Sequence, residues 1–157
     1  MKPKTTLTLL VIGIGMIVLP AYTSSHIKTT PSTDIRGLAI KYYSGKLKLL
    51  GNGLETGSNT TITINPATKI INVSGETVTQ EKVNFNITIE SIECNLNEKC
   101  TAGEAIYHGY IAQKKGAPAK LTLKVEARSG SLVISNSIPG SNNEYLAYVS
   151  KWEIIKD

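Results

Sequence analysis

The segment Val83-Asn-Phe-Asn-Ile-Thr-Ile-Glu90 decides the fold class of this chain of 157 residues. Its apolar and polar side chains alternate with a period of two, which is typical of a β-strand that is buried on one face. The only two cysteines follow, at Cys94 and Cys100, and a second strand-like segment runs from Glu104 to Gln113. We therefore predict a β-hairpin whose connecting loop carries both cysteines.

Each strand of this hairpin is expected to contain an irregularity. Ile89 and Ile92 cannot both face the interior unless one extra residue is inserted between them. We therefore predict a β-bulge near Glu90-Ser91. In the second strand, Gly109 indicates either a bend or the close approach of another group.

Shorter strands are predicted on both sides of the hairpin. Thr60 to Ile64 and Lys69 to Ser74 flank Asn65-Pro66-Ala67-Thr68, which suits a type I turn because proline fixes φ at its second position. Leu121 to Ala127 alternates as the first segment does, and a last strand is expected between Glu144 and Ile155.

The segment that precedes these strands has two interpretations. Ser44-Gly45 fits a two-residue hairpin turn between Leu38–Tyr43 and Lys46–Leu50. A short helix that begins after Asp34 would also place several apolar residues on one face. We favour the hairpin, which brings the total to about nine strands.

Many short strands separated by turns, without a long helix, predict an all-β domain. We expect a single antiparallel β-sandwich of about eight to nine strands. A closed or partly open β-barrel is the alternative.

Residues 1–23 have the layout of a secretory signal peptide. Met1-Lys-Pro-Lys4 supplies a positive start, and Leu7 to Leu19 is an uncharged, mostly apolar run. This run is shorter than the roughly 20 residues of a membrane-spanning helix, so we favour cleavage, somewhere in 21–25, over retention as an anchor. Residues 24–34 are then expected to form a flexible N-terminal segment, and residues 35–157 a single all-β domain that does not span the membrane.

Two cysteines behind a signal peptide predict one disulfide, between Cys94 and Cys100, in a secreted or periplasmic protein. Closing so small a loop contributes roughly 2.4 kcal/mol by the chain-entropy estimate. We therefore expect the bridge to restrict its own loop and most of the sheet to stay folded when it is reduced.

The charge of the chain does not indicate a nucleic-acid partner. The formal net charge of +5 includes two lysines of the signal peptide, so the mature chain carries +3. Arg36 and Arg128 are the only arginines, and arginine is the residue that makes bidentate contacts with phosphates and bases. We expect the partner to be an unknown protein or another component of the envelope or the extracellular space.

The sequence contains no recognisable catalytic constellation, metal site or cofactor motif. Two histidines are too few for the usual zinc sites, and a G-x-S-x-G nucleophile motif is missing. Glu90, Glu93 and Glu104 lie around the hairpin and could supply the paired carboxylates of a glycoside hydrolase. Outward-facing charges at strand ends are much commoner, so we expect a protein that is not an enzyme, with a hydrolase as the least favoured alternative.

Two functions are compatible with these features. The favoured one is a secreted or periplasmic module that binds a macromolecule or serves as a structural accessory. The alternative is a small β-barrel that carries an apolar ligand, with Tyr107, His108 and Tyr110 as weak binding candidates near its mouth. A filled core without a sizeable cavity would contradict the carrier function.

Overall fold

A computed structural model describes residues 35–76, 81–113, 116–141 and 144–156. The predicted signal peptide, its cleavage site and the N-terminal segment 24–34 lie outside these described residues. None of the described segments is a helix that is long and apolar enough to span a membrane. The regular elements are the 3-10 helix η1 (Ile35–Gly37) and the strands β1 (Ile40–Leu49), β2 (Glu55–Asn65), β3 (Ile70–Glu76), β4 (Lys82–Cys94), β5 (Glu104–Ile111), β6 (Ala119–Arg128), β7 (Ser131–Ser137) and β8 (Tyr145–Ile154).

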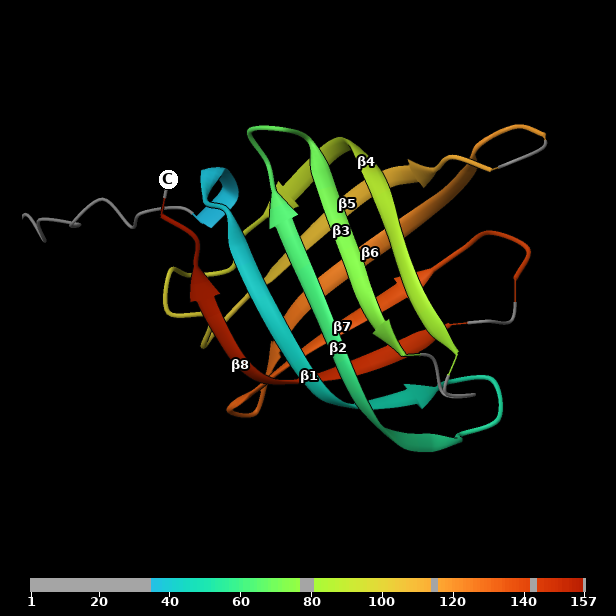
Figure 1. Cartoon of the computed structure of the whole chain (residues 1–157). Coiled ribbons are helices and arrows are strands. Elements are labelled where there is room, and N and C mark those ends of the chain that lie inside the picture. Colours follow the sequence, from blue (N-terminus) through green and yellow to red (C-terminus); the bar gives the residue numbers. More distant parts are fainter. Residues whose placement is uncertain (1–34, 77–80, 114–115, 142–143, 157) are drawn as a thin grey trace, which may run out of the picture. The chain divides into compact units, whose positions relative to one another are not determined.

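The strands form one antiparallel sheet that closes into a barrel (Figure 1). Each strand pairs with the next one along the chain, and β8 pairs with β1, from Ile40 opposite Ile154 to Leu49 opposite Tyr145. The predicted all-β class is confirmed, and the barrel that stood as the alternative is the correct architecture. The preference for a sandwich was wrong, because alternation shows that one face of a strand is buried but does not show where the sheet closes.

The hairpin of β4 and β5 contains the predicted bulge. The pairing register of these strands shifts between Ile89 and Ser91, which allows Ile89 and Ile92 both to pack in the core. Gly109 lies opposite Ile89, where a Cβ atom would come within 2.3 Å of the Thr88 carbonyl oxygen. The close approach expected at this glycine is therefore confirmed.

The turn predicted at Ser44-Gly45 is wrong, because these residues lie inside the continuous strand β1. The register of β1 against both of its neighbours shifts between Ser44 and Lys46. Against β8, Gly45 is the extra residue of a bulge, whereas against β2 the extra residue belongs to β2, where Ser58 and Asn59 lie opposite Gly45. Within the bulge, the Ser44 hydroxyl donates to the Lys46 carbonyl oxygen at 2.8 Å. Merging the two predicted strands reduces the count from about nine to the eight of the barrel.

The barrel interior is filled at the end where η1 and the β4–β5 loop lie, which we call the capped end. Ile35 of η1 and Leu96 of the loop are 1% and 2% exposed, so both close this end against solvent. The large side chains of Tyr42 and Tyr107 are fully buried in the same core. We call the opposite end of the barrel the mouth end. It is the end of the β1–β2, β3–β4, β5–β6 and β7–β8 connections.

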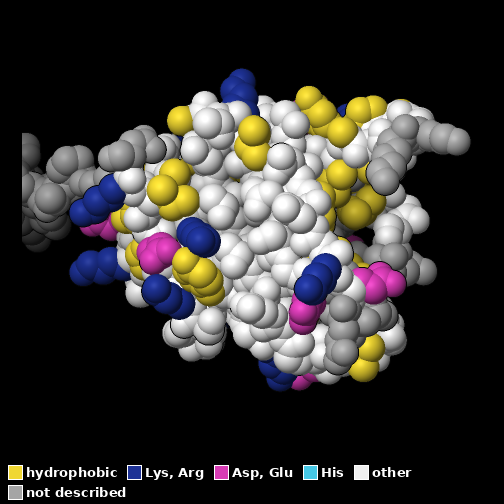
Figure 2. Space-filling view, viewed as in Figure 1, with side chains coloured by type: hydrophobic (Ala, Val, Ile, Leu, Met, Phe, Trp, Pro, Cys, Tyr) yellow, Lys and Arg dark blue, Asp and Glu magenta, His cyan; other side chains and the backbone are white. Residues whose placement is uncertain are grey.

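The outer face of the barrel is polar. Figure 2 shows few hydrophobic or charged side chains over the middle of β2, β3 and β4. On this face the Asn72 amide nitrogen donates to the amide oxygens of Asn84 and Asn86, at 3.0 and 2.8 Å. Because the amides of three outward positions satisfy one another, the outside of these strands is covered by a hydrogen-bonded layer.

Candidate ligand cavity

The barrel contains a cavity of about 280 Å³ towards its mouth end. Its position follows from the strand ends that line it, which include Val83 near the start of β4, Ile111 at the end of β5 and Tyr145 at the start of β8. On the right of Figure 2, hydrophobic side chains border a hollow in the surface. The wall is mainly apolar, with Ile62, Phe85, Ile87, Leu121, Leu123 and Ile134 among its residues.

Two small residues contribute to the cavity towards the mouth end. Val73 occupies an inward position of β3 and Ala147 one of β8, among larger apolar residues of the wall. The capped end instead holds the two buried tyrosines, Tyr42 and Tyr107. An eight-stranded barrel is just wide enough for side chains to fill, so these two small residues leave space that larger ones would occupy.

The end of β3 and its neighbour β2 form one side of the rim. The hydroxyl groups of Ser58 and Thr60 lie 2.6 Å apart, and both are within hydrogen-bond distance of the Glu76 carbonyl oxygen, at 3.4 and 3.3 Å. A Cβ atom at Gly75 would lie 2.5 Å from the Thr60 Cα atom, so only glycine allows this approach. Glu76 is paired with Lys82, and both occupy outward-facing positions of their strands. The carbonyl group of Glu76, and not its carboxylate, therefore belongs to the rim.

Asn136 and Tyr145 form another side of the rim. They lie opposite each other on β7 and β8, and both line the cavity. The Asn136 amide oxygen accepts a hydrogen bond from the Tyr145 backbone nitrogen at 2.9 Å. This bond fixes the orientation of the amide, so its NH2 group is the donor that remains at the rim. The polar groups of the described rim are thus hydroxyl, amide and carbonyl groups.

The predicted binding residues Tyr107, His108 and Tyr110 do not form one site. Tyr107 is 2% exposed inside the barrel, whereas His108 and Tyr110 face outward from β5. The two ring nitrogens of His108 lie 3.2 Å from the Thr122 hydroxyl and 3.3 Å from a Glu93 carboxylate oxygen. None of the three predicted residues lines the cavity. The residues that do line it were not singled out from the sequence, because their inward faces become apparent only with the register.

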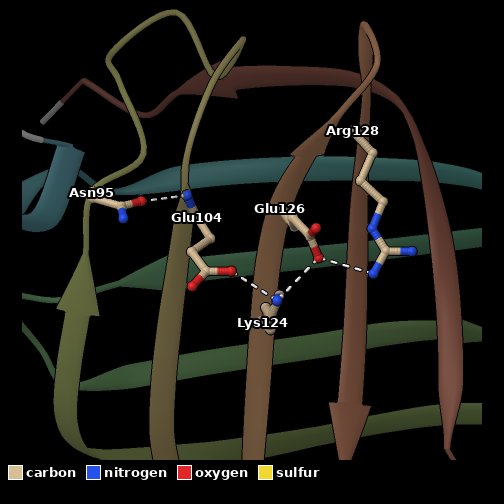
Figure 3. A network of polar contacts seen from close by, with 5 residues as sticks. All are labelled: Asn95, Glu104, Lys124, Glu126 and Arg128. Carbon is tan, nitrogen blue, oxygen red and sulfur yellow. Dashed lines mark hydrogen bonds and ion pairs between the residues drawn. The ribbon is translucent and has the colours of Figure 1, made fainter.

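Of the acidic residues around the hairpin, Glu104 is paired with a cation on the outer face. The Glu104 carboxylate lies 2.7 Å from the Lys124 ammonium group, and the Asn95 side chain accepts from the Glu104 backbone nitrogen at 2.7 Å (Figure 3). Lys124 also contacts Glu126, whose pKa is lowered mainly by its hydrogen bond with Arg128. Among the described residues, no three His, Cys, Asp or Glu side chains gather where they could hold a metal ion.

The two cysteines belong to the capped end. No disulfide joins Cys94 and Cys100 in the structure, so the predicted bridge is not shown and stays a prediction. Burial raises the pKa of the Cys100 thiol to about 11, and the neighbouring Cys94 adds to this effect. The Tyr42 hydroxyl beside Cys100 is buried without a partner of suitable hydrogen-bond geometry in the described part of the chain. Burial also raises the pKa of Tyr42 above its ordinary value.

These features define a class of protein: a closed, eight-stranded antiparallel barrel with a mainly apolar cavity, whose described rim carries hydroxyl, amide and carbonyl groups. Comparison with known proteins found no matching family model, no similar curated protein and no similar solved structure. The functional argument therefore rests on the cavity itself.

Proposed function

We propose that the protein is an exported, non-enzymatic carrier that binds a small apolar ligand inside its barrel. The observation that carries this proposal is the apolar cavity of about 280 Å³. Eight-stranded barrels either fill their interior with side chains or hold one small ligand. This barrel is filled at the capped end and hollow towards the mouth, which is the distribution that a carrier needs.

The volume of the cavity limits the size of the ligand. An engineered protein cavity of about 150 Å³ binds benzene, which corresponds to roughly 25 Å³ for each non-hydrogen atom. By this ratio a cavity of about 280 Å³ holds about eleven non-hydrogen atoms. A ten-carbon alcohol has this size, so we place the ligand among small amphiphiles with a single short chain.

Export is supported by the N-terminal sequence and by the positions of the cysteines. Residues 1–23 have the charge and apolar pattern of a signal peptide. Cys94 and Cys100 flank one short loop and influence each other electrostatically, which suits a local disulfide in a secreted or periplasmic protein. N-terminal sequencing and intact mass of the protein recovered from its own host test both points. A mature chain that begins between residues 22 and 26 and is lighter than the reduced chain by two hydrogen atoms is the expected result.

A series of linear alcohols tests the carrier function. Each buried methylene group contributes about 0.8 kcal/mol, or about a fourfold increase in affinity. We expect calorimetric affinities to rise by this factor from hexanol to decanol and then to level off, because the cavity is full at about eleven non-hydrogen atoms. Absence of binding throughout the series would contradict the proposal, and so would affinities that do not depend on chain length.

Contact with a macromolecule is the second candidate, favoured by a cationic and aromatic surface on β1 and β8. The ammonium groups of Lys41 and Lys151 lie 5.1 and 5.2 Å from the centre of the Tyr43 ring. The Tyr43 hydroxyl donates to Glu153 at 2.6 Å, which holds the ring in place between the lysines. Dextran sulfate is a suitable polyanionic probe. Binding that is lost in the double variant Lys41→Ala/Lys151→Ala, in a protein that fails to bind alcohols, would make this surface the functional one.

A further inference from the structure

We infer that the ligand is an uncharged amphiphile, whose aliphatic chain lies in the cavity and whose hydroxyl or carbonyl group lies at the rim. This inference rests on the proposed carrier function and adds the chemical class of the ligand. It is based on the division of the cavity into two zones. The wall is formed mainly by apolar side chains. Of the polar groups, Glu76 and Asn136 lie at the ends of β3 and β7, and Thr60 of β2 lies level with the end of β3.

The rim can both donate to and accept from a neutral head group. The Asn136 NH2 group is a donor whose direction is set by the bond from the Tyr145 nitrogen to the amide oxygen. The Thr60 hydroxyl donates to the Glu76 carbonyl oxygen at 3.3 Å, so these two oxygens offer their remaining lone pairs as acceptors. An alcohol has one hydroxyl group that donates once and accepts twice, so it can satisfy these groups and bury its chain at the same time.

At the described part of the rim, a charged head group would find no opposite charge on an inward-facing side chain, since Glu76, the charged residue that lines the cavity there, occupies an outward position of β3. In the described part of the cavity, the side chains that the register turns inward are apolar or neutral. Removing a carboxylate or an ammonium group from water is costly when no opposite charge compensates for it. The rim should therefore prefer a neutral amphiphile to a fatty acid anion or an alkylammonium ion of the same length.

Ligands of equal chain length separate this inference from the carrier function. We would measure the binding of decanol, decanoate and decylamine to the protein at neutral pH by isothermal titration calorimetry. Decanol is expected to bind at least tenfold more tightly than either ion. If decanoate or decylamine binds as tightly as decanol, the inference is overturned and the carrier function stands. If none of the three binds, the carrier function fails and the inference fails with it.

The substitution Asn136→Asp tests whether the rim recognises the head group. It keeps the oxygen that accepts from the Tyr145 nitrogen and replaces the NH2 donor by a negatively charged oxygen. Decylamine should gain about fivefold to tenfold in affinity, as expected for a partly buried ion pair, and decanoate should lose affinity. Ser74→Asp, which adds the same charge on the outer face of β3, should change neither affinity.

A second variant covers the case in which Asn136→Asp does not fold. Thr60→Val removes one hydroxyl of the rim and keeps the shape of the side chain. Decanol should lose about threefold to tenfold in affinity, the usual range for one hydrogen bond, and decane should be unaffected. Folded variants that keep the head-group preference of the natural chain would overturn the inference.

Discussion

Enlarging Val73 should shorten the ligand that the barrel accepts. Val73 lines the cavity from β3, in the stretch where small inward residues leave the interior unfilled. Phenylalanine at this position adds about four carbon atoms to the interior, which take up roughly 100 Å³ at about 25 Å³ for each atom. Of the original 280 Å³, roughly 180 Å³ would remain.

The expected loss of affinity depends on the length of the ligand. The remaining space holds about seven non-hydrogen atoms, the size of hexanol, instead of about eleven. Decanol would therefore leave about four methylene groups outside the cavity in Val73→Phe. At about 0.8 kcal/mol each, this is a loss of about 3 kcal/mol, or about 200-fold in affinity. Hexanol should bind with nearly unchanged affinity.

Calorimetric titrations of hexanol and decanol into the natural chain and two variants measure this difference. Ser74→Phe is the matched control, since it adds an aromatic ring to the outer face of the same strand. It should leave both affinities unchanged. An equal loss for hexanol and decanol in Val73→Phe would indicate a general distortion of the barrel, and an unchanged affinity for decanol would show that the chain binds elsewhere. Either result would refute the reasoning.

Three further predictions concern the stability of the barrel. Gly75→Ala should lower the free energy of unfolding by about 1 to 3 kcal/mol in urea titrations. The alanine Cβ would lie 2.5 Å from the Thr60 Cα atom, and the φ of residue 75 is positive. Gly57→Ala is the control, and it should be nearly neutral because no atom lies within 4 Å of the added Cβ. Tyr42→Phe should leave stability unchanged or raise it by about 1 kcal/mol, because it removes a buried hydroxyl without a suitable partner, and a loss above about 1 kcal/mol would reveal a hydrogen bond there. In the reduced protein, burial raises the folded-state pKa of Cys100 to about 11, from an ordinary value near 9. The stability that this thiol contributes is therefore complete below pH 9 and is lost as the pH rises towards 11. The loss amounts to at most about 3 kcal/mol, and it should be smaller in Cys100→Ala; an equal pH dependence in both proteins would contradict the assignment.

Local irregularities of the strands could be predicted from the sequence because each depends on a few neighbouring residues. The bulge near Ser91 follows from two isoleucines whose spacing breaks the alternation, and Gly109 lies where another strand comes close. Ser44-Gly45 carries the same kind of local signal, but there the strands β2 and β8 pair on both sides of β1 and turn a possible hairpin into a bulge. Pairing with strands distant in the sequence decides whether Ser44-Gly45 forms a hairpin turn or a bulge, and the local sequence carries no information about that pairing.

The cavity could not be predicted for a related reason. Val73 and Ala147 are small, but their sizes matter only because closure of the barrel directs them into the same space. The separation of Tyr107 from His108, in contrast, was already contained in the alternation of β5, since neighbouring residues of a strand face opposite sides.

In the proposed carrier, the capped end of the barrel interior provides stability, and the mouth end provides the binding cavity. At the capped end, buried side chains such as Ile35 and Tyr107 fill the interior, and a large-to-small substitution there creates a new void that typically costs about 2 to 5 kcal/mol. Towards the mouth end a void is already present, so its small residues contribute less packing and their enlargement mainly changes what can enter. A closed sheet makes this division possible, because the backbone hydrogen bonds around the barrel do not depend on whether its interior is full. The unfilled end is therefore tolerated by the fold, and it is the place where selection for a ligand can act without loss of the barrel.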